Sequence, residues 1–267
     1  DEIHMEDLVK QEDVIVTITH KGYVKRMAMD TYRTQKRGGT GVKGADGADD
    51  DFYTSIFTAN THSTLFIFTN KGQVFSIKVY NIPEGNRTTK GRNIVNLIQL
   101  PSGESVKKIM CLPDNIEGKF LMIATEKGIV KKSELSEYKN IRQSGLTAIK
   151  IVDGDELLSV RITDGTKDVL LCSSSGKIIR FAETDCRPLG RVSQGVKGIE
   201  LSEDEKIIGM EIIDDTVEIL SVTANGYGKR TSVSEYRKQS RGGKGILAMR
   251  LTDKNGDIID IKPVTDK

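Results

Sequence analysis

Tryptophan is absent from this chain of 267 residues, and all aromatic residues together make up 5% of it. Any platform that stacks on the bases of single-stranded nucleic acid would therefore need Tyr, Phe or Arg. No apolar run approaches the roughly 18 residues that cross a membrane, and the chain has no positively charged signal-peptide start. The three cysteines, Cys111, Cys172 and Cys186, lack CxxC spacing. They predict reduced thiols of a cytosolic protein, without a disulfide framework or a zinc site.

The chain also lacks a large excess of either positive or negative side chains. Lys and Arg number 40 against 38 Asp and Glu, for a net charge of +2, so a nucleic-acid surface would have to be local. His4, His20 and His62 lack the HxxxH and HExxH spacings of metal sites, and no carboxylate pair stands out as an acid–base couple. The length fits one large domain or two small ones. Because the chain begins with Asp1 rather than Met, we expect a fragment of a longer protein.

Helical periodicity is weak as well, and the chain carries a repeat instead. Five segments align on one glycine, at spacings of 50, 56, 48 and 50 residues. Each segment is an apolar β-rich run, a turn and a second short run, with Thr or Ser three residues before the glycine. A glycine at this place supplies the positive φ of a hairpin turn. The five turn glycines are Gly22, Gly72, Gly128, Gly176 and Gly226.

A second glycine follows nineteen residues after the turn glycine in four of the five repeats, and an arginine stands four residues before it. The third repeat has Thr147 in place of this glycine, with Gly145 two residues earlier, and Gln143 in place of the arginine, with Arg142 beside it. Hairpin geometry does not explain an arginine at a fixed loop position. The four pairs are Arg37 with Gly41, Arg87 with Gly91, Arg191 with Gly195 and Arg241 with Gly245.

Units of about 50 residues with roughly four short strands are typical of the blades of a circular or spiral β array. We therefore predict an all-β fold, in which "SELSEYKNI" and "SVSEYRKQS" are loops or short strands. The connector after the fifth repeat leads towards a further unit that this chain does not contain, so a sixth blade has been removed or the array stops open. Residues 1–13 are predicted to be a linker or an edge strand, and the blades are predicted at 14–60, 61–112, 113–163, 164–214 and 215–262.

The most elaborate loop is "TQKRGGTGVKGADG", residues 34–47. Consecutive glycines let a backbone approach a ligand closely, and flanking Arg and Lys suit phosphate oxygens. The GxxxxGK[ST] pattern of a mononucleotide loop and the strand–helix context of a dinucleotide loop are both absent. Similar loops recur as "NRTTKGR", "GRVSQGVKG" and "SRGGKG" in other repeats. Because equivalent loops of successive blades face the same way, we expect a basic rim that binds a continuous polyanion.

The strand after each turn adds further cations: Lys25 and Arg26, Lys131 and Lys132, Arg180, and Lys229 and Arg230. Solvated charges on an outer strand are the alternative explanation. Together with the loops, these residues favour duplex DNA, because no recognition helix is available and few aromatic side chains could stack on bases. The predicted contacts are to phosphates, independent of sequence and steeply weakened by salt.

The chain resembles the C-terminal domain of the A protein of DNA gyrase, which is a bacterial type IIA topoisomerase. "QKRGGTG" is similar to the gyrase A box, the heptad Gln-Arg-Arg-Gly-Gly-Lys-Gly, and "EDVIVTITHKGYVKR", "AIKIVDGDELLSV" and "NGYGKRTSVSEY" also look like gyrase A sequence. The resemblance covers essentially the whole chain. It implies a single β-pinwheel domain over residues 1–267, with strands exchanged between neighbouring blades; six blades are usual in the family, and five are evident here.

The resemblance and the repeated loops together define the candidate DNA contacts. In the box, Lys36 replaces Arg and loses the bidentate fork, and Thr40 replaces Lys and removes one charge. The acidic run from Asp46 to Asp51 that follows is expected to be a solvated loop, or to compete with DNA. The candidates in the box are Gln35, Lys36, Arg37, Gly38, Gly39, Thr40 and Gly41. Those elsewhere are Lys43, Arg87, Lys90, Arg92, Arg142, Arg191, Lys197, Arg241 and Lys244.

By the same resemblance, the domain wraps duplex DNA chirally and so enables ATP-dependent negative supercoiling. It has no catalytic residue and no cofactor of its own, since the resemblance places the DNA-cleaving Tyr in the N-terminal part of the gyrase A protein, and ATP and Mg²⁺ on the gyrase B protein. The implied partners are duplex DNA, that N-terminal part and gyrase B in an A2B2 complex. The implied location is the bacterial cytoplasm, in association with the nucleoid.

Two alternatives remain open. One is the equivalent domain of the ParC protein of topoisomerase IV, which carries a degraded or absent box; the nearly intact heptad of this chain favours gyrase. The other is a propeller that binds protein, whose basic loops are merely solvated. An enzymatic propeller with a central active site is disfavoured, because no convergent catalytic set is evident in the strands.

Overall fold

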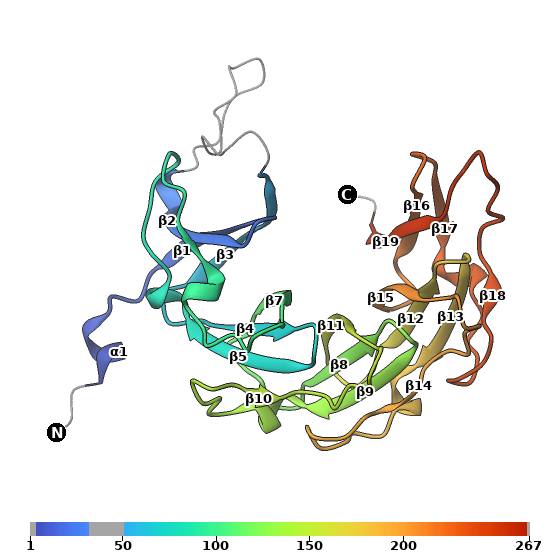
Figure 1. The fold of residues 1–267 in the computed structure, drawn as a ribbon, viewed down its shortest axis with the longest axis horizontal. Coiled ribbons are helices and arrows are strands. Elements are labelled where there is room, and N and C mark those ends of the chain that lie inside the picture. Colours follow the sequence, from blue (N-terminus) through green and yellow to red (C-terminus); the bar gives the residue numbers. More distant parts are fainter. Residues whose placement is uncertain (1–3, 32–50, 266–267) are drawn as a thin grey trace, which may run out of the picture. The chain divides into compact units, whose positions relative to one another are not determined.

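The computed structural model describes residues 4–31 and 51–265. The chain divides into two compact units. The first contains residues Asp1–Ile67, Phe75–Asn115 and Ile141–Leu146, and the second contains Phe68–Val74, Ile116–Asn140 and Thr147–Lys267. Within the described ranges the regular structure is almost entirely β, with one short helix, α1 (Met5–Leu8), and several 3₁₀ turns (Figure 1).

Each repeat begins with a long hairpin whose strands fall on either side of the turn glycine. Two hairpins in the first half are β1 (Asp13–Thr19) with β2 (Tyr23–Ala28), and β4 (Thr64–Thr69) with β5 (Gln73–Lys78). The three later hairpins are β8 (Phe120–Thr125) with β9 (Ile129–Glu134), β12 (Asp168–Ser173) with β13 (Lys177–Ala182), and β16 (Glu218–Thr223) with β17 (Gly228–Ser232).

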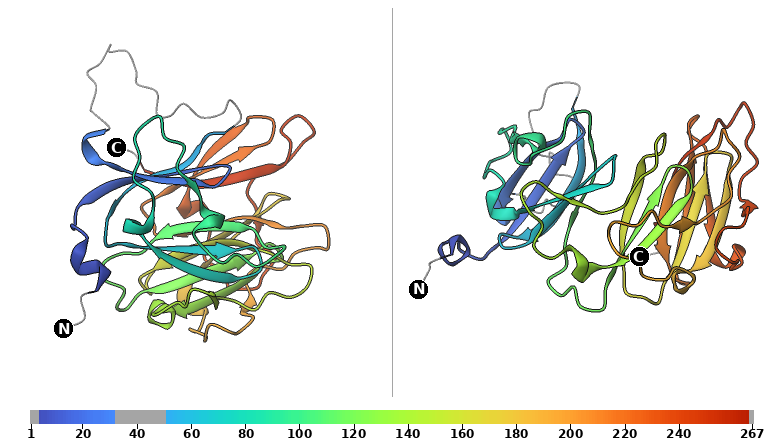
Figure 2. Two further views of the ribbon diagram at one scale, coloured as in Figure 1. Left: turned by 60° about the vertical axis from the view of Figure 1, so that its left-hand side comes forward. Right: turned by 60° about the horizontal axis from the view of Figure 1, so that its bottom comes forward.

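A third strand pairs with the first strand of each hairpin and forms one edge of the sheet. These strands are β3 (Tyr53–Asn60), β7 (Val106–Cys111), β11 (Leu157–Thr163), β15 (Ile207–Ile213) and β19 (Ile258–Val264). In the fourth sheet these strands follow the order β15–β12–β13. The right-hand view of Figure 2 shows the yellow and orange strands of this part of the chain side by side. Buried Val, Ile, Leu and Phe side chains form the cores, for example Val16, Leu65 and Phe75 in the first unit and Leu171, Ile179 and Phe181 in the second.

The turn of every hairpin is built in the same way. All five turn glycines have φ between 83° and 93°, a conformation that other residues rarely adopt. The Thr or Ser three residues earlier accepts a hydrogen bond from the N–H that follows the glycine, as Thr19 does from Tyr23 at 3.1 Å and Ser173 from Lys177 at 3.2 Å. The Thr/Ser column of the repeat therefore caps the turn, in addition to being compatible with a strand.

The fourth strand of a sheet comes from the following repeat. β6 (Arg92–Asn93) pairs with β2, β10 (Leu146–Thr147) with β5, β14 (Val196–Lys197) with β9 and β18 (Ile246–Leu247) with β13. Four sheets therefore have four strands, and the fifth has three among the described residues, in the order β17–β16–β19. This exchange confirms the predicted all-β fold of blades with exchanged strands.

Short 3₁₀ helices follow the hairpins, and this corrects one expectation. "SELSEYKNI" contains η4 (Leu135–Tyr138) and "SVSEYRKQS" contains η6 (Val233–Glu235), where loops or strands were predicted. Ser232 caps η6 by accepting a hydrogen bond from Ser234 N–H at 3.4 Å. The other helical turns are η1 (Met29–Thr31), η2 (Val79–Asn81), η3 (Ile94–Asn96) and η5 (Glu183–Asp185).

Candidate nucleic-acid interface

The glycine-basic loops are fixed to the sheet of the preceding repeat by backbone contacts. The carbonyl oxygen of each of the first four turn glycines accepts a hydrogen bond from a residue just beyond the next repeat's loop: Ile94 on Gly22 at 2.8 Å, Ala148 on Gly72 at 2.8 Å, Gly198 on Gly128 at 2.7 Å and Ala248 on Gly176 at 2.9 Å. The turn glycine of one repeat and the second glycine of the next repeat therefore take part in the same contact between a sheet and the loop that docks on it.

The second glycine is required because the loop passes very close to the neighbouring strand. A Cβ on Gly91 would lie 2.3 Å from the carbonyl oxygen of Val24, and one on Gly195 would lie 2.5 Å from that of Val130. Gly245 stands in the same relation to Ile178, at 2.7 Å. All three glycines also have positive φ, between 73° and 89°. No other residue fits at this position without moving the loop away from the strand.

The docked loops carry cations at their surface. Of the predicted contact residues outside the first loop, the structure leaves five exposed and three half-buried. The exposed ones are Lys90, Arg92, Arg142, Lys197 and Lys244, and the half-buried ones are Arg87, Arg191 and Arg241. The predicted residues Gln35 to Gly41 and Lys43 lie outside the described residues.

Part of the arginine column is engaged with the protein itself. Arg241 donates from Nη1 to the carbonyl oxygen of Lys197 at 2.6 Å and from Nε to that of Asp185 at 3.3 Å, which ties the fifth loop to the fourth repeat. Arg191 pairs with Glu137 across 3.9 Å. These arginines therefore hold loops in place as well as contributing positive charge.

The strand cations, in contrast, do not form the surface that the sequence suggested. Lys25, Lys131, Lys132 and Arg180 are at most 5% exposed, Arg26 is half-buried, and only Lys229 and Arg230 are exposed. The expectation that these residues contact DNA is therefore wrong for the buried four. Each of them binds a carbonyl or carboxylate oxygen of the following repeat. Lys131 and Arg180 also bind Ala148 and Asp168 of their own repeats.

A signal for this burial was present in the repeat. Three residues after the turn glycine the five repeats have Lys25, Phe75, Lys131, Ile179 and Lys229. The two apolar members indicate a position that faces the interior, so the lysines of the same column lie there too. The strand pattern alone predicted exposed lysines, because a charged side chain in a strand usually faces water.

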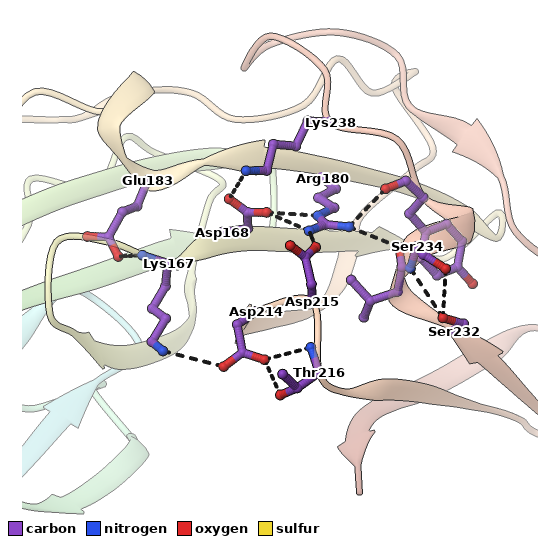
Figure 3. A network of polar contacts seen from close by, with 12 residues as sticks. Lys167, Asp168, Arg180, Glu183, Asp214, Asp215, Thr216, Ser232, Ser234 and Lys238 are labelled. Carbon is purple, nitrogen blue, oxygen red and sulfur yellow. Dashed lines mark hydrogen bonds and ion pairs between the residues drawn. The ribbon is translucent and has the colours of Figure 1, made fainter.

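Lys132 and Arg180 illustrate how such charges are compensated. Lys132 Nζ lies 3.0 Å from Glu183 Oε1, and both side chains are at most 5% exposed. Arg180 contacts Asp168 and Asp215, and Lys238 joins the same Asp168 at 3.2 Å, as Figure 3 shows. Buried cations of this kind organise the contact between successive repeats.

Burial also changes the acidity of Lys131. Desolvation, with a smaller contribution from the charge of Arg191, lowers the pKa of Lys131 to about 8. An unfolded lysine titrates near 10.4. Between these values the unfolded chain binds a proton that the folded chain does not, so the free energy of unfolding should rise with pH by up to about 1.4 kcal/mol per pH unit.

A matched variant isolates this effect, because buried thiols act in the opposite direction at higher pH. Burial raises the pKa of Cys172 to about 12 and that of Cys186 to about 11. We expect the stability difference between the wild-type chain and Lys131→Met to shift by about 1 kcal/mol in favour of wild type from about pH 7.5 to about pH 9. Urea unfolding at both values measures it, and a constant difference would contradict the shifted pKa.

Metal-binding clusters and long apolar helices are not found in the described part of the chain. Across residues 4–31 and 51–265, no three His, Cys, Asp or Glu side chains are grouped so that they could hold a metal ion. Over the same ranges, no helix is long and apolar enough to cross a membrane.

Known proteins share this arrangement of repeats. A family model described as the DNA gyrase C-terminal domain, beta-propeller, matches residues 13–60, 63–113, 119–164, 167–214 and 218–265. The DNA gyrase A protein of Clostridium acetobutylicum is 48% identical over 197 residues, which is 74% of this chain and 24% of that protein. The DNA gyrase A protein of Halalkalibacterium halodurans is 46% identical over 193 residues, 72% of this chain and 23% of that protein.

Solved structures with the same fold include domains of a DNA topoisomerase IV and of a DNA gyrase. The C-terminal domain of a DNA topoisomerase IV superposes with a TM-score of 0.81 at 30% identity, covering 97% of this chain and 79% of that one. A DNA gyrase A C-terminal domain superposes with a TM-score of 0.74 at 29% identity, covering 95% of this chain and 83% of that one. The chain spans about a quarter of the length of the curated relatives it matches. With the family model matched over all five repeats, the chain belongs to the DNA gyrase C-terminal domain family.

Proposed function

We propose that this chain binds duplex DNA independently of sequence through its glycine-basic loops, bends it and wraps it with one handedness. The observation that carries the proposal is the repeated docking of these loops. Each described loop is fixed by the same hydrogen bond to a turn glycine of the preceding repeat, and each carries an exposed Lys or Arg. Each described loop therefore presents at least one exposed cation beside the sheet on which it docks, although the position of that cation within the loop differs between repeats.

The chemistry of the loops fits phosphates rather than bases. The described residues contain one α-helix, of four residues, which is too short to read a major groove. Exposed Lys and Arg bind phosphate oxygens through charge-assisted hydrogen bonds, which carry no sequence information. Binding should therefore weaken steeply as salt rises, because each neutralised phosphate releases counterions.

Bending requires several contacts to act together. Bending a site of 20–30 bp by 40–90° costs on the order of 1–6 kcal/mol. One exposed cation does not offset this free energy, but contacts from several repeats do. Lys90 and Arg92 of the second repeat, Arg142 of the third, Lys197 of the fourth and Lys244 of the fifth are available for this purpose.

We further propose that the chain acts within DNA gyrase, as the names of its relatives suggest. The remainder of the gyrase A protein and the gyrase B protein, joined in an A2B2 complex, would then supply DNA cleavage and ATP hydrolysis. The location would be the bacterial cytoplasm, in association with the nucleoid. The wrapped DNA would be presented to the cleavage site so that strand passage introduces negative supercoils.

The box provides the decisive test. Replacing Gln35 to Gly41 by alanine in the complete enzyme should abolish ATP-dependent negative supercoiling and leave the fold intact, because the heptad is the most elaborate loop of the series. Gel electrophoresis of plasmid topoisomers measures supercoiling, and circular dichroism of the variant chain controls for folding. Normal supercoiling by a folded variant would show that the box is not the decisive contact.

Two measurements on the isolated chain separate the alternatives. A propeller that binds only protein would fail to retard a duplex of ~100 bp at low salt, where phosphate contacts are strongest. The topoisomerase IV alternative and the gyrase proposal differ in wrapping. If the chain wraps DNA as gyrase does, circles that are nicked and then closed while bound to the chain should change their linking number. If the chain binds but the linking number stays the same, bending remains possible and the proposal of chiral wrapping is contradicted.

A further inference from the structure

The loop of the second repeat folds around a buried ammonium group from the first sheet. Lys25 Nζ donates to three carbonyl oxygens of this loop: Asn86 at 2.9 Å, Arg87 at 3.3 Å and Thr89 at 2.8 Å. An ammonium group has three N–H donors, so this set satisfies it completely. The Lys25 residue is 2% exposed.

The loop is wound so that these carbonyl groups converge. The side-chain oxygen of Asn86 accepts hydrogen bonds from the N–H groups of Thr88 at 3.0 Å and Thr89 at 3.1 Å, and from both of their hydroxyl groups. The turn that results directs the carbonyl oxygens of residues 86, 87 and 89 inwards. Their negative ends repel one another at such short range unless a positive charge lies between them.

The third sheet repeats this arrangement. Lys131, at the position equivalent to Lys25, donates to the carbonyl oxygen of Ala148 at 2.7 Å and to that of Arg191. Arg191 and Arg87 occupy the same position of the repeat, four residues before the second glycine. Equivalent lysines therefore hold two different loops, each by the carbonyl group of the arginine at the same position of the repeat.

Packing of the sheets does not require a lysine at this position. The second and fourth sheets have the buried apolar residues Phe75 and Ile179 there. Burying an ammonium group is unfavourable unless its hydrogen bonds are satisfied. The burial of Lys25 and Lys131 is therefore explained by the loop carbonyl groups that satisfy their hydrogen bonds.

We propose that Lys25 and Lys131 are positioning residues for DNA binding, which hold the loops 86–92 and 190–197 in the shape that directs their cations at phosphates. This inference rests on the proposed function. Lys90 directly follows the clamped carbonyl group of Thr89, and its Nζ lies 4.1 Å from the ring centre of Tyr23. Lys90 thus extends from a point that Lys25 fixes, and Lys197 extends from the loop that Lys131 fixes.

The first experiment removes the clamp without touching an exposed cation. Lys25→Met keeps the apolar stem and deletes the ammonium group; Lys71→Met is the matched control, because it deletes one charge at an exposed hairpin turn. Affinity for a ~100 bp duplex is measured with the full chain as a function of salt. We expect Lys25→Met to weaken binding about tenfold and Lys71→Met at most about twofold, since long-range charge effects are screened.

The second experiment distinguishes positioning from general destabilisation. Lys90→Ala should weaken binding about fivefold in the wild-type chain, and by less than about twofold in the Lys25→Met chain, because its loop is already displaced. The proposed role of Lys25 would be contradicted if the losses of affinity from Lys25→Met and Lys90→Ala multiply in the double variant. It would also be contradicted if Lys25→Met binds the duplex as tightly as the wild-type chain. If Lys25→Met does not fold, Lys131→Met with Lys197→Ala gives the same comparison. Failure of the wild-type chain to bind the duplex would instead overturn the proposed function.

Discussion

Replacing Arg180 by methionine should lower the free energy of unfolding of this chain by about 3–5 kcal/mol, the range observed when one partner of a buried ion pair is removed. Arg180 is 5% exposed and contacts Asp168 through Nε at 2.9 Å and Nη2 at 2.8 Å. Its Nη1 also donates to the carbonyl oxygens of Val233 at 3.0 Å and Tyr236 at 3.3 Å (Figure 3). The variant would leave Asp168 buried with Lys238 as its remaining ion-pair partner.

Urea unfolding of the chain measures this loss, and two further variants apportion it. Asp215→Asn should cost less than about 1 kcal/mol, because the Asp215 side chain is 82% exposed. The double variant Arg180→Met with Asp168→Leu should recover most of the loss, since an apolar pair replaces a broken ionic one. If the double variant is no more stable than Arg180→Met, the carbonyl contacts carry the stability. A loss below about 1 kcal/mol for Arg180→Met would contradict the role of the buried charge.

The largest effect on DNA should come from removing the exposed loop cations together. A chain with Lys90, Arg92, Lys197 and Lys244 all replaced by alanine should bind a ~100 bp duplex about a thousandfold more weakly at ~0.1 M salt. Four phosphate contacts contribute about 3.6 to the slope of log K against log salt, at about 0.9 for each contact. The same variant should therefore show a slope that is flatter by about that amount.

The control for this variant removes four lysines that lie outside the loops. Lys71, Lys119, Lys127 and Lys254 are exposed or half-buried and serve this purpose. If charge alone mattered, both fourfold variants would lose equal affinity. A flatter slope confined to the loop variant would place the phosphate contacts at the loops, and an unchanged slope in that variant would contradict the proposed contacts.

The repeat made much of this fold predictable. The hairpin turns were visible because Gly22 and its four equivalents need a positive φ, which is a property of the local chain. The second glycine column was also visible, but its reason was not. Gly91 is required by the carbonyl oxygen of Val24, and these two residues are 67 positions apart in the chain. Only the docked loop shows why no side chain fits.

The exposure of the loop cations was easier to predict than that of the strand cations, for a physical reason. Lys90 and Lys244 lie in loops, and Lys197 ends the two-residue edge strand β14, where a charged side chain reaches water whatever covers the rest of the sheet. Lys25, Lys131 and Arg180 lie in strands, and their exposure depends on which segment covers the strand. The covering segment belongs to the next repeat, so the local pattern of each strand could not reveal it.

By itself the sequence determined five β hairpins in tandem, the positions of their turns and a recurring loop of glycine with Arg or Lys, since these depend on backbone conformation and repeat spacing. The resemblance implied strand exchange between blades, but only the tertiary structure showed that each described loop supplies the fourth strand of the preceding sheet. That exchange turns Lys25 and Lys131 from surface charges into buried clamps, because it brings the carbonyl groups of Asn86 and Arg191 over them and excludes water.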